Sequence, residues 1–260
     1  MKTSTTGDNK RIIEVLRKAL AILFWVLIWQ IAAMAVDKEI LIVSPLVTIE
    51  RLFELVGEGW FWKSSFMSLI RIMEGFFVGV VAGIVAAVFT STIRVINDLL
   101  SPIMSVIKAT PIASFIILLL VWIKRDNVPL FAVALMVTPI IWANVCEGIS
   151  STDKNLLEMA KVFKFSGLKK ITKIYIPNIM PTFIAGCTTA MGLAWKAGVA
   201  AEVLSLPNNS IGKELYHSKI YIETADLFAW TAVVIILSMI LEYLLKKVFK
   251  SIGGGYGYRD

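Results

Sequence analysis

Residues 156–181 read LLEMAKVFKFSGLKKITKIYIPNIMP, a basic amphipathic segment that separates two long apolar runs. Its apolar residues recur every three to four positions, which is the period of an α-helix, and lysines occupy the positions between them. Ser166-Gly167 interrupts this pattern and predicts a turn between two short helices. Pro177 stands where the next apolar run starts, a position at which a missing N–H costs little. A charged helical insert between membrane spans must lie on an aqueous face.

The composition is that of a membrane protein. Hydrophobic residues make up 57% and charged residues 17% of the 260 positions, and the mean hydropathy is +0.77. These values lie outside the range of soluble domains. A chain of this length fits one polytopic domain, residues 1–260, without a soluble catalytic domain. The single histidine excludes a histidine-based metal cluster, so we expect no metal site and no catalytic residue.

The apolar runs predict an all-α fold with six transmembrane helices. Between the first two runs, residues 37–64 contain a short stretch whose pattern predicts an interfacial helix. Gly75, Gly79 and Gly83 in the second run form a stripe that allows another helix to approach closely. The predicted spans are about 19–36, 66–90, 109–123, 128–148, 178–203 and 227–245.

The distribution of basic residues predicts the orientation. Six spans place both termini on one side, together with the 151–176 loop. That side carries 16 of the 26 lysines and arginines, and the opposite side carries seven. The positive-inside rule therefore predicts cytoplasmic termini and a cytoplasmic 151–176 loop. The net charge of +7 follows this topology, so we expect no nucleic-acid partner.

The opening segment resembles the cytoplasmic "EAA" loop of ABC-importer permeases. Glu158-Met159-Ala160 and the prolines at the family's spacing carry the resemblance; Met159 replaces the first alanine, and Lys164 stands where the family has a glycine. The resemblance implies that residues 151–176 form a hairpin, here called the coupling hairpin, that docks into a groove on a separate ATPase. The residues it assigns to coupling are Glu158, Ala160, Lys161, Phe163, Lys164, Ser166, Gly167, Pro177 and Pro181. The alternative is a membrane-surface helix whose lysines contact anionic lipid.

Charged residues inside the predicted spans are costly unless they face protein or water. Lys196 lies deep in the fifth span, and two hypotheses remain open for it: a role in the translocation path or a buried ion pair. Arg71 and Lys108 lie close enough to span ends to reach the membrane surface. Glu74 is three residues from Arg71, the spacing of an ion pair on one helix.

A second resemblance covers about residues 65–260. The stretches IKATPIASFIILLLVWI (107–123) and GLAWKAGVAAEVL (192–204) are similar to the nitrate, sulfonate and taurine branch of type I (MetI-like) ABC-importer permeases. The resemblance implies a homodimer, two cytoplasmic ATPase subunits that hold ATP and Mg²⁺, and an extracellular substrate-binding protein. It implies no cofactor on this chain, which lacks a nucleotide-binding motif. It also divides the chain into an N-terminal part, 1–64, a core permease, 65–250, and a flexible tail, 251–260.

The expected function is inward transport of a small anion such as a sulfonate, taurine or nitrate. The third and fifth spans would line the path, and the loop 204–226 would meet the binding protein. A thiamine-precursor pyrimidine is the alternative substrate, and an ion-coupled secondary transporter is the remote alternative function. The residues expected at the path or its gate are Lys196, Trp195, Glu202, Lys108, Thr110 and Pro111.

Overall fold

The computed structural model describes residues 5–253, and this part of the chain is built from helices without strands. The predicted all-α fold is therefore confirmed. Most of the predicted flexible tail, residues 254–260, lies outside the described residues. The elements are α1 (Thr5–Val36), α2 (Pro45–Val56), α3 (Gly59–Thr92), α4 (Arg94–Ala109), α5 (Ile112–Trp122), the 3-10 turn η1 (Arg125–Asn127), α6 (Val128–Ser150), α7 (Lys154–Val162), α8 (Gly167–Lys170), the π-helical turn η2 (Ile171–Tyr175), α9 (Ile176–Ser205), α10 (Ile211–Ile220) and α11 (Thr224–Gly253).

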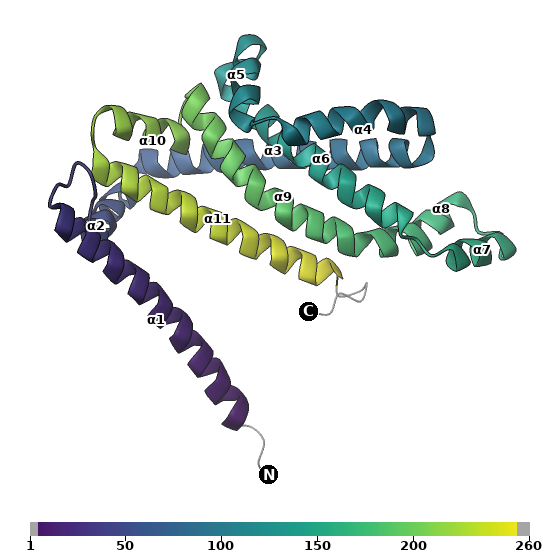
Figure 1. Cartoon of the computed structure of the whole chain (residues 1–260), viewed down its shortest axis with the longest axis horizontal. Helices are drawn as coiled ribbons and strands as arrows, with labels where there is room; N and C mark the ends of the chain where they lie inside the picture. The colour runs from purple at the N-terminus through teal and green to yellow at the C-terminus, as the bar shows by residue number, and fades with distance from the viewer. Residues whose placement is uncertain (1–4, 254–260) are drawn as a thin grey trace.

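The core forms around α6, which packs along both α3 and α9 (Figure 1). The glycine stripe of α3 faces α6. A Cβ atom added at Gly79 would lie 2.7 Å from the Cβ of Val137, and one added at Gly83 would lie 2.8 Å from the Cβ of Ile141. Only glycine permits this distance between the two backbones. The stripe is thus a packing feature, as the sequence predicted.

In the described part of the chain, four helices are long and apolar enough to cross a membrane: Leu16–Val36, Gly59–Thr92, Arg125–Ser150 and Thr224–Ser251. They correspond to the predicted first, second, fourth and sixth spans. α9 corresponds to the fifth span. It has 30 residues, but it is less apolar than these four and is not among them. Its buried face is rich in small residues that pack against α3, α6 and α11.

The predicted third span, 109–123, is wrong as a single helix. α5 has only 11 residues, whereas about 20 are needed to cross the hydrocarbon of a bilayer. α4 precedes it, and the two axes are bent by 107° at Thr110-Pro111. A proline disfavours the α conformation in the residue before it, and Thr110 is accordingly extended. The pair is one broken span or a re-entrant loop, which brings the number of apolar spans to five at most.

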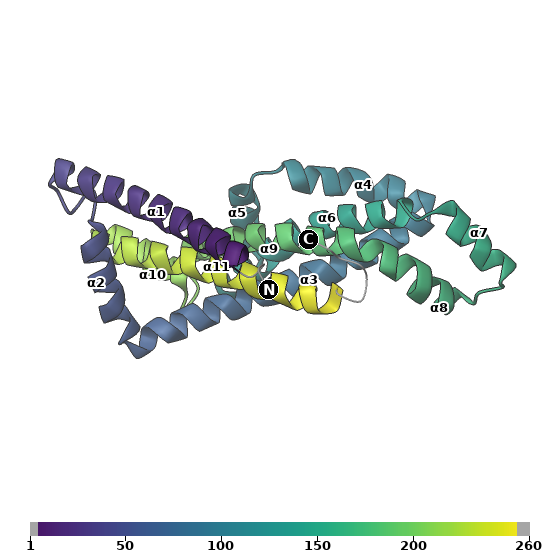
Figure 2. The ribbon, with the colours of Figure 1, turned by 90° about the horizontal axis from the view of Figure 1, so that it is seen from below.

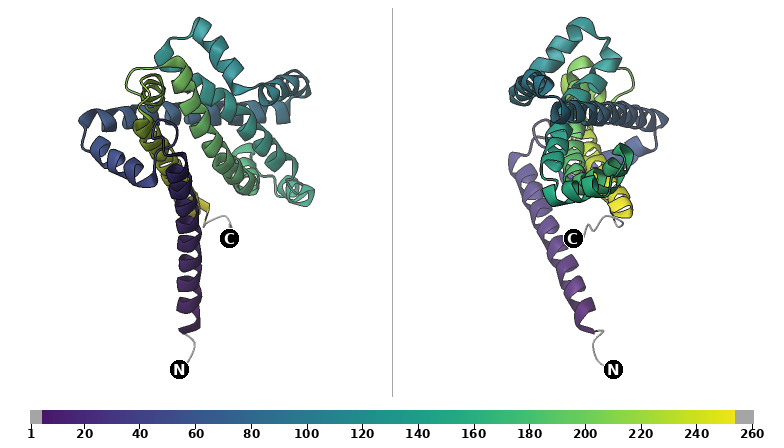
Figure 3. Two further views of the ribbon diagram at one scale, coloured as in Figure 1. Left: turned by 60° about the vertical axis from the view of Figure 1, so that its left-hand side comes forward. Right: turned by 90° about the vertical axis from the view of Figure 1, so that its right-hand side faces the viewer.

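α1 projects away from the core, as Figure 3 shows. Its attachment lies near its C-terminal end, where Trp29 stacks on Phe228 and donates its indole N–H to the carbonyl of Val43 at 2.9 Å. Ser44 caps α2 by accepting from the N–H of Val47. The predicted interfacial helix is therefore present, and it carries exposed apolar side chains such as Phe53, 75% exposed.

The two ends of α9 define two ends of the molecule. The hairpin end carries α7 and α8, and the α10 end carries α2 and α10 (Figures 1 and 2). η1 also belongs to the α10 end, because the side chain of its Asp126 accepts from the N–H of Asn208. These names are kept below.

Candidate functional site

The first arm of the coupling hairpin is α7, and its ends are fixed by local hydrogen bonds. The Asp153 side chain accepts from the N–H of Asn155 at 2.8 Å and caps the N-terminus. At the C-terminus, the N–H of Phe165 donates to the carbonyl of Ala160 at 2.9 Å, and that of Lys164 to the carbonyl of Lys161 at 3.0 Å. This pair of bonds is a Schellman motif, which requires a left-handed residue between the arms.

Lys164 is that residue, with φ of 49°. The left-handed conformation favours glycine, and this is the position at which the resembling family has its glycine. The departure noted in the sequence therefore leaves the turn itself unchanged. Lys164 adopts the conformation that the turn requires.

The second arm differs from the predicted separate short helix. Ser166 caps α8 by accepting from the N–H of Lys169, and the helix then runs through η2 directly into α9. The run 167–205 is therefore helical throughout, with a change of direction between α8 and α9 (Figures 1 and 2). Pro177 lies in the first turn of α9, as predicted, and Pro181 lies inside it. Because Pro177 has no N–H to donate, it fits beside a π-helical turn, where the regular hydrogen-bond pattern is already broken.

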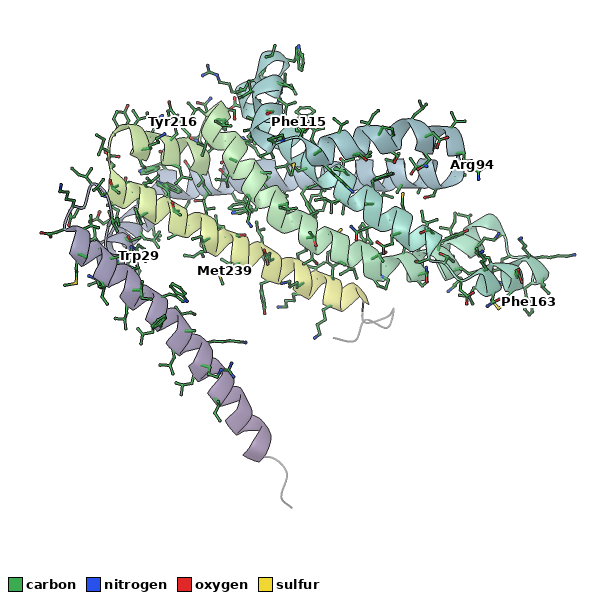
Figure 4. All side chains as sticks on the ribbon, in the orientation of Figure 1. Trp29, Arg94, Phe115, Phe163, Tyr216 and Met239 are labelled. Atoms are coloured by element: carbon green, nitrogen blue, oxygen red, sulfur yellow. The ribbon has the colours of Figure 1, made fainter. Side chains whose placement is uncertain are left out.

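The tip of the hairpin is apolar and exposed. Phe163 is 70% exposed, Val162 78% and Leu168 78%, and Figure 4 shows Phe163 at the far end of the hairpin. Glu158, Lys161 and Lys164 are also exposed, whereas Ala160 is buried between the arms and the bundle. An exposed apolar cluster on an aqueous loop marks an interaction site.

The base of the hairpin is tied to the bundle. The amide of Asn178 donates to the carbonyl of Gly148 at 3.0 Å and to the hydroxyl of Thr152 at 3.1 Å. Beside it, a mainly apolar cavity of about 680 Å³ lies between α3, α6, η2 and the start of α9. Ile84, Ile171 and Ile179 are among the residues that line it.

Lys196 is exposed on the surface of α9 and forms no salt bridge with the residues that the structure describes. The buried intrasubunit ion pair considered for it is therefore not present. Trp195 differs from its neighbour: it is 1% exposed, and its indole N–H donates to the carbonyl of Val234 at 3.0 Å. Its ring fills the contact between α9 and α11, and its expected place at the path or its gate stays a prediction.

Lys108, Thr110 and Pro111 meet at the 107° bend between α4 and α5. Lys108 is exposed, and its ammonium lies 5.7 Å from the centre of the Trp142 ring, within the range of a cation–π contact. The Trp142 ring is held by its N–H, which donates to Thr90 at 2.9 Å. The Thr110 hydroxyl donates back to the carbonyl of Val106 and shapes the bend. The bend therefore presents a lysine on the surface of the subunit.

Glu202 is fully buried inside the subunit, and its expected place at the path or its gate stays a prediction. Its carboxylate accepts from Ser68 at 2.7 Å and lies 3.8 Å from the guanidinium of Arg71. Arg71 consequently does not extend to the membrane surface, and Glu74, which is exposed, is not its partner. The signal in the sequence was two opposite charges inside two different spans.

A second charged contact lies at the α10 end, between α2 and α11. Arg51 donates to both carboxylate oxygens of Asp226 and also to Glu54. Hydrogen bonds to Asp226, and then to Glu54, raise the pKa of Arg51 above its ordinary value. A guanidinium is charged in either case, and this contact joins α2 to α11 at the α10 end.

These features are those of a helical membrane protein with an exposed hairpin, in which Lys108 and Lys196 are exposed on α4 and α9. Residues 79–251 match the family model described as the binding-protein-dependent transport system inner membrane component. The chain belongs to this family. It is a multi-pass inner-membrane component of a transporter that works with ATPase and substrate-binding partners, and the resemblance stated from the sequence is confirmed.

Individual relatives agree with the family. SsuC of Bacillus subtilis, a permease protein named for aliphatic sulfonates transport, is 24% identical over 204 residues, which cover 78% of this chain and 74% of the relative. The bicarbonate transport system permease protein CmpB of Synechococcus elongatus is 26% identical over 201 residues, which cover 73% and 72%.

Two solved structures share the fold. An amino acid ABC transporter solved with histidines aligns with a TM-score of 0.60 at 16% identity, over 81% of this chain and 97% of that one. The inward-facing MetNI methionine ABC transporter aligns with a TM-score of 0.55 at 18% identity, over 80% and 99%. Both confirm the type I ABC-importer architecture.

Proposed function

We propose that this chain is the permease subunit of an ABC importer for a small anion, and that it acts as a homodimer. Two cytoplasmic ATPase subunits would bind ATP and Mg²⁺, and a binding protein outside the membrane would deliver the solute. The substrate class follows the branch: sulfonates, taurine and nitrate by resemblance, and bicarbonate by the similarity to CmpB. All of these are small, and taurine, the one zwitterion among them, still presents a sulfonate.

The observation that carries the anion assignment is the position of Lys196. It lies in the fifth predicted span, yet its side chain is exposed and forms no salt bridge within residues 5–253. A lysine at membrane depth needs water, a counter-charge or a passing anion. Lys108 presents a second exposed cation at the α4–α5 bend. Cations along a pore favour anions, provided that they bind weakly enough for release.

The coupling hairpin supplies the contact with the ATPase. Its tip presents exposed apolar side chains next to exposed Glu158, Lys161 and Lys164, a combination that suits the apolar centre and polar rim of a protein interface. The continuous helical run from Gly167 to Ser205 connects this contact to the membrane helices. The positive-inside rule supports a cytoplasmic hairpin end and an extracellular α10 end.

The alternative substrate is a thiamine-precursor pyrimidine carried by the same architecture. The remote alternative, an ion-coupled secondary transporter, has no support from inverted repeats in the sequence. Lipid contacts are expected around the exposed apolar faces of the bundle.

Lys196→Met tests the proposal, because it keeps the side-chain length and removes the charge. In proteoliposomes with the ATPase and the binding protein, we expect sulfonate, nitrate or bicarbonate uptake to fall about tenfold or more, equivalent to about 1.4 kcal/mol of barrier, while basal ATP hydrolysis persists. Lys63→Met, which removes an exposed lysine near the start of α3, is the matched control and should transport normally. Wild-type anion uptake by Lys196→Met would contradict the assignment. If the Lys196→Met variant takes up a neutral pyrimidine at the wild-type rate, the result would favour the alternative substrate.

A further inference from the structure

A buried carboxylate lies where the α10 end of α9 meets the rest of the protein. Glu202 is 0% exposed, and its Oε2 accepts from the Ser68 hydroxyl at 2.7 Å and from the N–H of Gly212 at 3.1 Å. Its Oε1 has no hydrogen-bond donor among the described residues and lies 3.8 Å from Nη1 of Arg71. A buried charge is costly unless it is paired and hydrogen-bonded. These four residues are called the Glu202 cluster.

The cluster caps the start of α10 with side chains from other helices. A helix begins with N–H groups that have no partner inside the helix. The first of these in α10, on Ile211, donates to the Ser68 hydroxyl at 2.9 Å, and the second, on Gly212, donates to Glu202. A carboxylate at this position also complements the helix dipole. α10 is therefore held by α3 and α9 and is not held by its own capping residue alone.

The guanidinium of Arg71 fixes the loop that leads into α10. It donates to the carbonyl of Asn208 at 2.7 Å and to that of Asn209 at 3.1 Å. The N–H of Asn208 in turn donates to Asp126 of η1 at 2.9 Å. Any movement of the 206–210 loop, η1 or α10 relative to α3 and α9 would therefore break these hydrogen bonds.

From this arrangement we propose that Glu202 is a positioning residue that couples α10 to α9. This inference rests on the proposed function. A binding protein that docks on α10 would act through the Glu202 cluster on α9, and α9 continues through η2 and α8 into the coupling hairpin. The cluster would thereby relay docking at one end of the molecule to the ATPase at the other.

The test measures ATP hydrolysis by the purified complex in nanodiscs at increasing concentrations of loaded binding protein. Glu202→Gln removes the charge, and Ser68→Ala removes the hydroxyl that joins Glu202 to Ile211. For both we expect the maximal stimulated rate to fall about tenfold, within the usual range of coupling effects. The basal rate, the assembly and the half-maximal binding-protein concentration should stay unchanged, because neither residue touches the docking surface. A merely structural role would lower assembly and the basal rate together.

Ser65→Ala is the matched control. Ser65 lies one turn before Ser68 on α3 and is also buried, but its hydroxyl has no hydrogen-bond partner in the described part of the chain. It should behave as wild type. Normal stimulation of either cluster variant would overturn the inference, and so would failure of both variants to assemble. Absence of stimulation in the wild-type complex would instead count against the proposed function.

Discussion

The two ends of α9 are built in opposite ways. At the hairpin end, α7 and α8 are shaped by hydrogen bonds within residues 153–170, and the apolar side chains at the tip are exposed. At the α10 end, the carboxylate of Glu202 is buried. It accepts hydrogen bonds from Ser68, more than 130 positions earlier in the sequence, and from Gly212, ten positions later. The first end is held by local hydrogen bonds, and the second by hydrogen bonds between distant residues. Apolar side chains are exposed at both ends, among them Phe53 on α2 and Ile222 after α10.

The exposed apolar side chains at the hairpin tip indicate a contact with a partner. A surface loop seldom exposes Val162, Phe163 and Leu168 together without a protein to cover them. At the α10 end, the polar groups of the Glu202 cluster form hydrogen bonds within the protein, and these bonds attach α10 to α9. The hairpin end is therefore the candidate for energetic contact with the ATPase, and the α10 end is the candidate for receiving a signal.

The largest expected effect is all-or-none and concerns the sides of the membrane. In a background without Cys146 and Cys187, we introduce Ser166→Cys at the hairpin end or Lys219→Cys at the α10 end, both at exposed positions. An impermeant maleimide added to intact cells should label position 219 and miss position 166, because the proposed topology places the two ends on opposite sides of the membrane. Labelling of both positions, or of position 166 alone, would contradict the topology.

The next effect concerns the hairpin tip. Phe163→Asp places a charge in the expected apolar contact and should weaken binding of the ATPase by about 2 kcal/mol or more, roughly 30-fold in affinity. Phe163→Leu keeps an apolar side chain and serves as the control. Co-purification with the ATPase and the stimulated hydrolysis rate report the result. Equal co-purification of the Asp and Leu variants would show that the exposed tip is not the contact.

The smallest effect compares one substitution at both ends. A Cβ atom added at Gly212 would lie 2.5 Å from the backbone nitrogen of Val203, whereas one added at Gly167 would meet nothing within 4 Å. Gly212→Ala should lower the free energy of unfolding by about 1–3 kcal/mol, and Gly167→Ala should change it by less than about 0.5 kcal/mol. Thermal unfolding of the purified subunit in detergent measures both. Equal changes in the free energy of unfolding would contradict the contrast between the α10 end and the hairpin end.

Features that depend on neighbouring residues were predicted from the sequence. The hairpin, the start of α9 at Pro177, the glycine stripe and the helical class all follow from local periodicity and from the special chemistry of glycine and proline. The 107° bend at Thr110-Pro111 was missed, although a proline flanked by apolar residues gives a local hint.

Features that depend on long-range pairing were not predicted. Nothing near Glu202 in the sequence indicates Ser68 or Arg71, since periodicity reveals which face of a helix is buried but not which helix covers it. Trp195 and Lys196 show the same limit. They are adjacent in sequence, yet one is buried against α11 and the other is exposed, and only the packing of α9 decides which.

The most direct measurement of the central claim is anion uptake into proteoliposomes that contain this permease, its ATPase and its binding protein. The account predicts that uptake requires ATP on the hairpin side of the membrane and loaded binding protein on the α10 side. It also predicts that uptake persists when ion gradients are collapsed. Uptake that proceeds without ATP and disappears with the ion gradient would contradict it.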